Sequence, residues 1–296
     1  MWFFIAIIGY LLLAVVFVMD KYILSEQKQK PVVYTFYSTI ILLVVFLAYP
    51  FGVDILHGID WFWALVSGVT FGLALYTTYT ALDIGEASHI SPFAGAFVTI
   101  FTYILSSFVL SEKLSSLQLF GLFVLVLATF LFSFEKSKKF KGFHVGFLWA
   151  ILAGFFFAVS HVSAKYLYDT YDFLSGFVWT RASTGFVGLI LLLSPIVRKT
   201  FKKKRKKVKI SFAGVFAIDK LLGALGVIAI QYAISIGSVT LVNAMVGVQY
   251  VLMFIIILLL TKFSPRVFKE YFTRREIAIE ILALVLVVVG SAMFVL

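Results

Sequence analysis

Long apolar runs dominate the chain, and short polar segments separate them. A run of about 20 apolar residues is the length that crosses roughly 30 Å of hydrocarbon as a helix. The pattern predicts ten such spans, at approximately residues 2–24, 32–52, 61–82, 88–110, 115–134, 143–167, 173–196, 211–234, 239–261 and 276–296. Alternating segments of about ten residues, which are typical of a membrane barrel, do not occur in the sequence. The sequence therefore predicts an all-α integral membrane protein with ten transmembrane helices.

The composition agrees with this prediction. Apolar residues make up 62% of the 296 residues and charged residues only 13%, whereas soluble domains are roughly half apolar and about a quarter charged. The chain contains no cysteine, which excludes disulfides, thiolate metal sites and cysteine nucleophiles. Residues 2–24 lack the basic leader and cleavage site of a signal peptide, so we expect this segment to be a helix of the mature protein.

The net charge of +11 is distributed unevenly over the predicted loops. Basic residues follow the first, fifth, seventh and ninth spans and are densest at residues 198–209, whereas the loops on the opposite side contain only Lys113. Basic loops of membrane proteins face the cytoplasm, so both termini are expected outside a cell membrane that the chain crosses many times. We expect residues 198–209 to contact anionic lipid headgroups or solvent, and we expect no nucleic-acid partner.

The two halves of the chain resemble each other. The segment FVMDKYIL at residues 17–24 aligns with HVSAKYLY at 161–168, and YTALDIGEAS at 79–88 aligns with QYAISIGSVT at 231–240. Each half then contains five spans, and an odd number makes the second half begin on the opposite side of the membrane. The sequence therefore predicts two inverted five-helix repeats, as in many secondary transporters, whose substrate sites lie near the midplane between the repeats. The predicted repeats are residues 1–135 and 143–296, and a basic linker at 136–142 joins them.

Several motifs support a family resemblance. They are a helix end at residues 79–81, a short turn at Gly85, Pro92 within the fourth span, Glu112 before the fifth and Gly121 inside it. With these motifs, residues 81–132 resemble the drug/metabolite transporter superfamily, specifically its EamA-type members. The resemblance implies a carrier of small polar or amphipathic metabolites that opens alternately to the two sides of the membrane. The second half departs from the motif, because Ala244 stands at the place that corresponds to Pro92.

Charged side chains within membrane spans cost about 2.5–3.5 kcal/mol each on insertion scales, so each one requires an explanation. Arg181 lies about nine residues into the seventh span and Asp219 a similar distance into the eighth, which places both near mid-depth and lets them pair. Neighbouring residues on a helix diverge by about 100°, so Lys220 is expected to point elsewhere, into a cavity. Two cations and one anion would favour an anionic substrate group such as a carboxylate or phosphate. The alternative is a buried ion network that only fixes helix register.

Other polar residues of the spans are candidates for substrate contacts: Tyr76, Tyr79, Gln231, Asn243 and Gln249. The amides can equally hold helices together, and tyrosines at helical spacing can pack against lipid or core. Gly68 and Gly72 have the spacing of close helix packing. Asp219 is the candidate for ion coupling, because a buried carboxylate can take up and release a proton. Asp20 lies closer to a helix end.

Lys21 and Lys165 occupy equivalent positions at the ends of the first and sixth spans. A lysine there can extend to the interface beside a tyrosine, or the two can act as paired gates at opposite mouths of a carrier. His161, one turn before Lys165, can carry a proton or pack in the core. The four histidines show no ligand spacing, so no metal site is expected.

These observations predict a secondary transporter that works by alternating access, with export of amino acids or related metabolites favoured. A carrier of phosphorylated or lipid-linked substrates is one alternative, and a membrane scaffold or an intramembrane enzyme is another. The sequence contains no nucleotide-binding glycine loop, GxSxG or HExxH motif. We therefore expect no enzymatic activity, no catalytic residue and no cofactor.

Overall fold

The structure, a computed structural model, describes residues 1–26, 29–85, 87–133, 145–202, 210–263 and 274–294, and the regular secondary structure within these ranges is entirely helical. Eight of the described helices are long and apolar enough to cross a membrane: Trp2–Leu24, Pro31–Phe51, Asp60–Ile84, Ile90–Val109, Val145–Thr170, Phe173–Leu191, Gly214–Ile236 and Val239–Phe263. Two shorter apolar helices, Ser116–Leu131 and Ile277–Ala292, lie where the fifth and tenth spans are predicted. The all-helical membrane fold is confirmed, and the count of ten spans stays a prediction.

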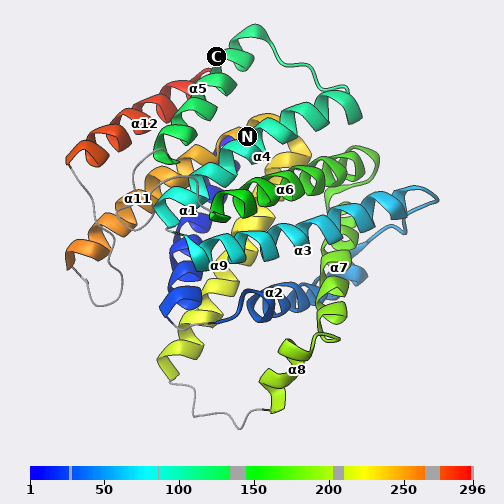
Figure 1. Cartoon of the computed structure of the whole chain (residues 1–296). Helices are drawn as coiled ribbons and strands as arrows, with labels where there is room; N and C mark the ends of the chain where they lie inside the picture. The colour runs from blue at the N-terminus through cyan, green and yellow to red at the C-terminus, as the bar shows by residue number, and fades with distance from the viewer. Residues whose placement is uncertain (27–28, 86, 134–144, 203–209, 264–273, 295–296) are drawn as a thin grey trace.

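Figure 1 shows how the helices are arranged. They are α1 (Trp2–Lys21), α2 (Pro31–Ile40), α3 (Asp60–Ile84), α4 (Ala87–Val109), α5 (Ser116–Ser133), α6 (Val145–Thr170), α7 (Phe173–Leu191), α8 (Pro195–Lys202), α9 (Ile210–Ile236), α10 (Val239–Ala244), α11 (Val246–Phe263) and α12 (Arg274–Ala292). Pro31 begins α2, where its missing N–H leaves no hydrogen bond unmade. Beyond α2 the second span continues as a 3₁₀ helix, Ile41–Phe51. The predicted linker 136–142 and part of the basic run, residues 203–209, lie outside the described residues.

The helix α1 packs along the length of α9 in the opposite direction. A Cβ at Gly9 would meet Ile230, a Cβ at Gly226 would meet Leu13, and a Cβ at Gly237 would meet Trp2. Residue numbers therefore fall along α9 as they rise along α1. Glycine at these positions lets the two helices approach closely, as small residues do in membrane interfaces.

The third and sixth spans pair in the same manner. Trp63 of α3 packs against Tyr166 of α6, and Tyr76 of α3 packs against Trp149. The residue number rises along α3 from the first contact to the second and falls along α6, so the two helices are antiparallel. Thus α1, the first span of the first half, is antiparallel to α9, the third span of the second half. In the same way α3, the third span of the first half, is antiparallel to α6, the first span of the second.

Equivalent spans of the two halves also pair. The second and seventh spans meet at Gly188 and Ile40, the fourth and ninth at Gly95 and Tyr250, and the fifth and tenth at Gly121 and Phe294. All three pairs are antiparallel, as further contacts show at Gly185 with Leu43, Ser106 with Thr240, and Gly290 with Leu125. An axis in the membrane plane reverses the direction of every helix that it relates, so two inverted repeats would produce this reciprocal pairing. The boundaries of the repeats stay a prediction.

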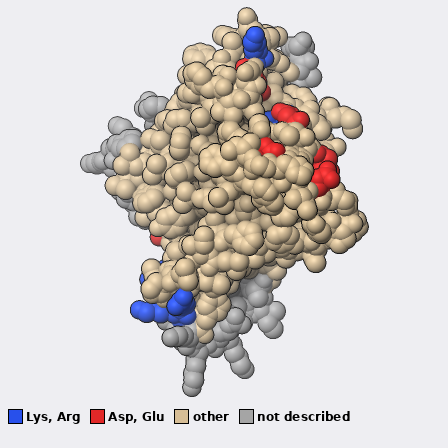
Figure 2. Space-filling model, turned by 90° about the vertical axis from the view of Figure 1, so that its right-hand side faces the viewer, with Lys and Arg blue, Asp and Glu red and all other residues tan. Residues whose placement is uncertain are grey.

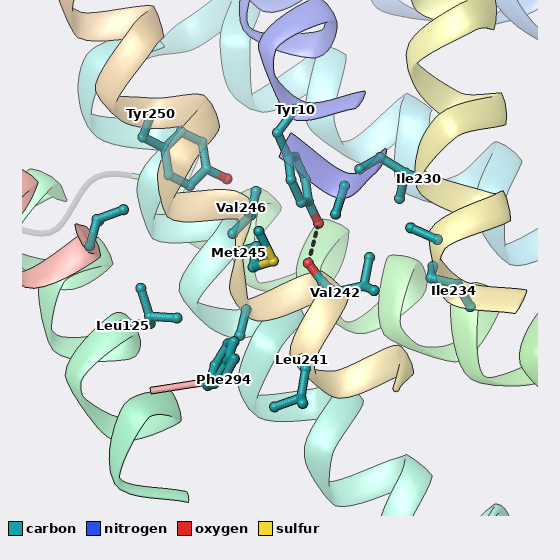
Figure 3. Packing of buried hydrophobic residues seen from close by; sticks show 14 of the residues in the cluster. Tyr10, Leu125, Ile230, Ile234, Leu241, Val242, Met245, Val246, Tyr250 and Phe294 are labelled. Carbon is teal, nitrogen blue, oxygen red and sulfur yellow. Dashed lines mark hydrogen bonds between the residues drawn. The ribbon is translucent and has the colours of Figure 1, made fainter. Parts of the chain in front are cut away.

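The largest apolar core lies where α1, α9, α10, α11 and α5 meet (Figure 3). The predicted ninth span is not one continuous helix, because α10 ends at Ala244 and α11 begins at Val246. The hydroxyl of Tyr10 donates a hydrogen bond of 2.8 Å to the carbonyl oxygen of Val242 beside this break (Figure 3). The same carbonyl oxygen accepts a hydrogen bond of 3.2 Å from the backbone N–H of Met245. In hydrocarbon, backbone groups at such a break need partners within the protein, and Tyr10 adds one from α1.

Charged side chains lie mainly toward two ends of the molecule. Figure 2 shows Lys and Arg side chains at its lower end, and toward the opposite end a group of acidic side chains with a few basic ones beside them. Arg198 and Lys199, beyond the C-terminal end of α7, are exposed, and so are Asp54 and Asp172 near the N-terminal end of that helix. This asymmetry agrees with the charge pattern of the sequence, and the side of the membrane that each end faces stays a prediction.

The helix α3 approaches α7 closely at Gly68. A Cβ there would lie 2.3 Å from the Cβ of Ser183 and 2.6 Å from the backbone nitrogen of Thr184. One turn later, a Cβ at Gly72 would lie 3.0 Å from a methyl carbon of Val187. The predicted close packing at this pair of glycines is confirmed.

We expect Gly68→Ala to lower the thermal midpoint of the purified protein, because the new methyl group would push α3 away from the backbone of α7. Over-packing of this kind costs about 1–3 kcal/mol. Gly223→Ala is the control, since a Cβ there would lie an ordinary 3.7 Å from Val16. Thermal unfolding in detergent measures both variants, and equal midpoints would contradict the close approach.

Candidate functional site

Two aspartates from different halves of the chain meet where α1 crosses α9. The side chains of Asp20 and Asp219 are buried, with exposures of 4% and 0% for the two residues. The hydroxyl of Tyr34, from α2, lies between them: it is hydrogen bonded to Oδ1 of Asp20 and lies 2.8 Å from Oδ2 of Asp219. The antiparallel packing of α1 and α9 explains the meeting, because it places these two positions at the same level.

Lys220 supplies a positive charge at this position. Its Nζ lies 2.8 Å from Oδ2 of Asp219 and 3.8 Å from Oδ1 of Asp20. The ammonium also faces the ring of Tyr34, 4.0 Å from the centroid, and the ring of Phe216, 5.4 Å from the centroid. We call Asp20, Tyr34, Asp219 and Lys220 the aspartate cluster. With both carboxyl groups ionised and the lysine charged, its net charge is one negative.

This arrangement shows that two expectations from the sequence were wrong. Arg181 does not pair with Asp219, whose described partners are Tyr34 and Lys220. Asp219 and Lys220 do not point to different places either, because the flexible four-carbon stem of a lysine can bend back to the neighbouring carboxylate. Asp20 was missed as a member of the cluster. The sequence signal was an acidic residue at the end of an apolar run, in the segment VMDKYIL at 18–24.

The two tyrosines predicted to contact substrate lie in different places. The ring of Tyr79 packs 4.6 Å from that of Tyr34, and its hydroxyl is 3.1 Å from Oγ of Ser38. Tyr76 packs instead against Trp149 of α6. Tyr79 therefore forms part of the aromatic wall of the aspartate cluster.

Arg181 is the largest fully buried side chain among the described residues. Its guanidinium carbon lies 4.1 Å from the ring centroid of Phe71 on α3 and 6.0 Å from that of Phe177 on α7. Its Nε, Nη1 and Nη2 atoms are all buried, and none has a hydrogen-bond partner in the described part of the chain. A guanidinium has five N–H donors and no acceptor, and burying it unpaired is costly. Any anion that reached this position would be strongly stabilised.

Hydrogen-bonding side chains from α6, α9 and α10 accompany Arg181. His161 and Tyr168 of α6 lie within electrostatic range of the guanidinium. Nδ1 of His161 is 2.7 Å from Oδ1 of Asn243, and the hydroxyl of Tyr168 donates to Oε1 of Gln231 at 2.9 Å. We call Arg181, His161, Tyr168, Gln231 and Asn243 the arginine site. It links four residues predicted from the sequence, and Tyr168 is the one that the sequence pattern did not single out.

Gln249 is buried on α11, and its Nε2 has no hydrogen-bond partner among the described residues. Like the guanidinium of Arg181, it is a buried donor whose acceptor does not come from the described chain. The structure therefore places it in the interior, as expected, and its role as a substrate contact stays a prediction.

Lys21 and Lys165 make equivalent contacts in the two halves. Nζ of Lys21 lies 2.7 Å from the carbonyl oxygens of Leu82 and Gly85, at the C-terminal end of α3. Nζ of Lys165 lies 3.2 Å from the carbonyl oxygen of Ser235, at the end of α9, and 2.8 Å from Asp169. Each lysine thus binds the last turn of the third span of its own half, where a cation also opposes the helix dipole. Their action as gates stays a prediction.

The aspartate cluster and the arginine site lie at different levels of the bundle. The helix α3 contributes a ring to each, Tyr79 to the first and Phe71 to the second. Eight residues of helix separate these rings, which corresponds to about 12 Å along the axis. The sequence suggested that Arg181, Asp219 and Lys220 lie in one polar centre. In the described structure Arg181 lies apart from the other two.

In the described ranges, no group of three or more His, Cys, Asp or Glu side chains could hold a metal ion. The polar chemistry that the structure does bring together is therefore ion pairing and hydrogen bonding. Both sites lie between elements of the two halves, since α1, α2 and α3 contact α7 and α9 there.

Comparisons with known proteins find a family model that is similar to the first half of the chain. Residues 1–134 match the model of the EamA-like transporter family, which is in the drug/metabolite transporter superfamily. This match confirms the resemblance predicted from residues 81–132. A solved structure, described only as "Crystal structure of protein", is similar with a TM-score of 0.65 at 18% identity over 99% of this chain and 94% of the other, so the two share a fold. A search of the curated proteins finds no match.

We expect Lys220→Met to lower the thermal stability of the protein by about 3–5 kcal/mol, because it removes the only described cation of the aspartate cluster. The deficit should shrink as the pH falls, since protonation of the aspartates removes the uncompensated charge. Lys199→Met is the control, because Lys199 is exposed on α8. A midpoint for Lys220→Met no lower than that of the control would mean that the ion pair contributes nothing.

Proposed function

We propose, from the match of residues 1–134 to the EamA-like transporter family, that the chain is a secondary transporter of a small metabolite with an anionic group. The observation that carries the proposal is Arg181, a fully buried cation whose three nitrogen atoms have no acceptor among the described residues. A carboxylate or phosphate of the substrate would supply that acceptor. A guanidinium suits both, because its planar fork of N–H groups can bind two oxygens at once.

The surroundings of Arg181 favour an amphipathic substrate. Phe71 and Phe177 offer apolar surface beside the guanidinium, and Gln231 and Asn243 carry amide groups on neighbouring helices. A carboxylate at Arg181, an apolar portion against the rings and a polar group at the amides would fit an amino acid or a related metabolite. Export of such a compound is the function that we favour.

The packing of the two halves supports alternating access. Arg181 lies on α7 of the second half, and the ring that covers it lies on α3 of the first. Rocking of one half against the other would open and close this contact from either side, as in transporters built from inverted repeats. The basic loops would face the cytoplasm and both termini the outside of the cell membrane.

A carrier of phosphorylated or lipid-linked substrates is the second candidate. The same guanidinium would bind a phosphate, and the exposed Arg198 and Lys199 of α8 lie where lipid headgroups would be contacted if that end meets the interface. A scaffold or an intramembrane enzyme has less support, because neither needs an unpaired buried arginine between the two halves.

Arg181→Met tests the site in proteoliposomes supplied with radiolabelled amino acids, organic acids and phosphorylated sugars. We expect the half-saturation concentration of the transported anion to rise by about 30-fold or more, as loss of a buried charge pair costs at least 2 kcal/mol. The thermal midpoint should stay the same or rise, because the variant removes a buried unpaired charge. Arg198→Met, which removes an exposed arginine, should change neither.

The two readouts separate function from structure. A lower midpoint together with lost flux would assign Arg181 a structural role. Unchanged flux of every solute would show that the arginine site does not bind substrate.

The inverted arrangement can be tested by labelling cysteines, since the chain has none of its own. Asp54→Cys and Lys199→Cys occupy the connections after the second spans of the two halves, and both positions are exposed. We expect a membrane-impermeant maleimide to label them from opposite sides, with Lys199→Cys on the cytoplasmic side. Labelling of both from the same side would exclude inverted repeats.

A further inference from the structure

We propose that the aspartate cluster binds one exchangeable proton, which Asp20 and Asp219 share through Tyr34, and that this proton drives transport. The driving role rests on the proposed function, whereas the proton-binding site stands by itself.

The hydroxyl of Tyr34 has too few hydrogens for both of its contacts with the aspartates. Its oxygen is hydrogen bonded to Oδ1 of Asp20 and is 2.8 Å from Oδ2 of Asp219. A phenol has a single hydrogen to donate, and its oxygen can otherwise only accept. If both carboxyl groups were ionised, one of the two contacts would bring lone pairs together without a hydrogen. One further proton resolves this: one acid donates to the tyrosine oxygen, and the tyrosine donates to the other carboxylate.

Asp219 has a carboxyl oxygen without a described partner. Oδ1 of Asp219 is buried and has no hydrogen-bond partner among the described residues. An ionised carboxylate in a buried site needs donors for both of its oxygens, whereas a neutral acid leaves a less polar carbonyl oxygen unpaired at smaller cost. A bound proton on the pair reduces this cost. Because Nζ of Lys220 also lies 2.8 Å from Oδ2 of Asp219, the proton is shared between Asp219 and Asp20 through Tyr34.

The buried charges of the cluster also favour one bound proton. Asp20 and Asp219 are 4% and 0% exposed, and the side chain of Lys220 is 10% exposed. Two carboxylates and one ammonium carry one excess negative charge, and one bound proton brings the cluster to neutrality. The rings of Tyr34 and Phe216 face the ammonium and stabilise its charged form. The variable charge therefore belongs to the aspartates.

The remaining titratable groups nearby have other partners. From α3, the hydroxyl of Tyr79 is 3.1 Å from Ser38 Oγ. From α1, Lys21 next to Asp20 is bonded to the carbonyl oxygens at the end of α3. Neither replaces the shared proton.

The position of the cluster links the proton to the transport cycle. Asp20 and Tyr34 belong to the first half of the chain, and Asp219 and Lys220 to the second. When the halves part at this end, the two acids separate and meet water, which favours ionisation and release of the proton. Closure brings them together again and requires a proton. Because the arginine site lies about 12 Å away along α3, proton and substrate occupy separate sites that the same closure couples.

Infrared spectroscopy of the full-length protein in lipid vesicles tests proton binding without any substrate. At neutral pH exposed aspartates are ionised, so the shared proton should appear as a protonated-carboxyl C=O band that disappears when the pH is raised. We expect Asp20→Asn and Asp219→Asn each to remove this band, and Tyr34→Phe to shift it. Asp54→Asn, which changes an exposed acid, should leave it unchanged.

The wild-type spectrum alone can overturn the proposal, so the test does not depend on whether the variants fold. The absence of the band in the wild type, or its survival in both Asp20→Asn and Asp219→Asn, would exclude the shared proton.

The driving role is tested in proteoliposomes with an imposed pH gradient, using a mixture of radiolabelled L-amino acids as the probe. We expect the wild type and Asp54→Asn to accumulate the probe in response to the gradient, and Asp20→Asn and Asp219→Asn to lose that response. Wild-type flux that ignores the gradient would overturn the driving role and leave the transporter proposal standing. If no amino acid moves at all, the proposed substrate class and the driving role both fail, while the infrared band still decides the proton site.

Discussion

The antiparallel packing of α1 on α9 is the contact on which the rest of the interior depends. Glycines at positions 9 and 226 let the two helices approach until side chains of one meet the backbone of the other. Because residue numbers run in opposite directions along the pair, Asp20 near the end of α1 comes level with Asp219 in α9. Two acids that are 199 positions apart in the chain thereby share one tyrosine hydroxyl and one ammonium.

The reciprocal contact between α3 and the second half builds the other polar centre. Gly68 holds α3 against α7, and Phe71, one turn along, then covers the guanidinium of Arg181. The two centres differ in their electrostatics. The acids of the aspartate cluster have a described cation beside them, whereas Arg181 meets aromatic rings and has no hydrogen-bond acceptor among the described residues. In a low-dielectric interior an uncompensated charge is expensive, so a ligand that neutralises it gains much of that energy on binding.

Part of this arrangement is predictable from the amino-acid sequence. Apolar runs of membrane-spanning length indicate the helices, and the KYI and KYL segments indicate the equivalence of the two halves. The buried charges at Arg181, Asp219 and Lys220 are candidates because charge is rare in such runs. The equivalence of Lys21 and Lys165 is also visible, but not its basis, since the carbonyl groups that they bind lie more than 60 positions away.

The sequence by itself determined the class of the protein, the positions of the helices and the list of buried polar residues, because hydrophobic length and the cost of charge in lipid act on each segment separately. Only the tertiary structure decided which of those residues meet. Helical periodicity suggested that Asp219 and Lys220 diverge, and their similar depth suggested that Arg181 can pair with Asp219. Instead, the lysine bends back to Asp219 and the arginine stacks on Phe71. Pairing between helices depends on their relative register and on side-chain flexibility, and neither is encoded within a single span.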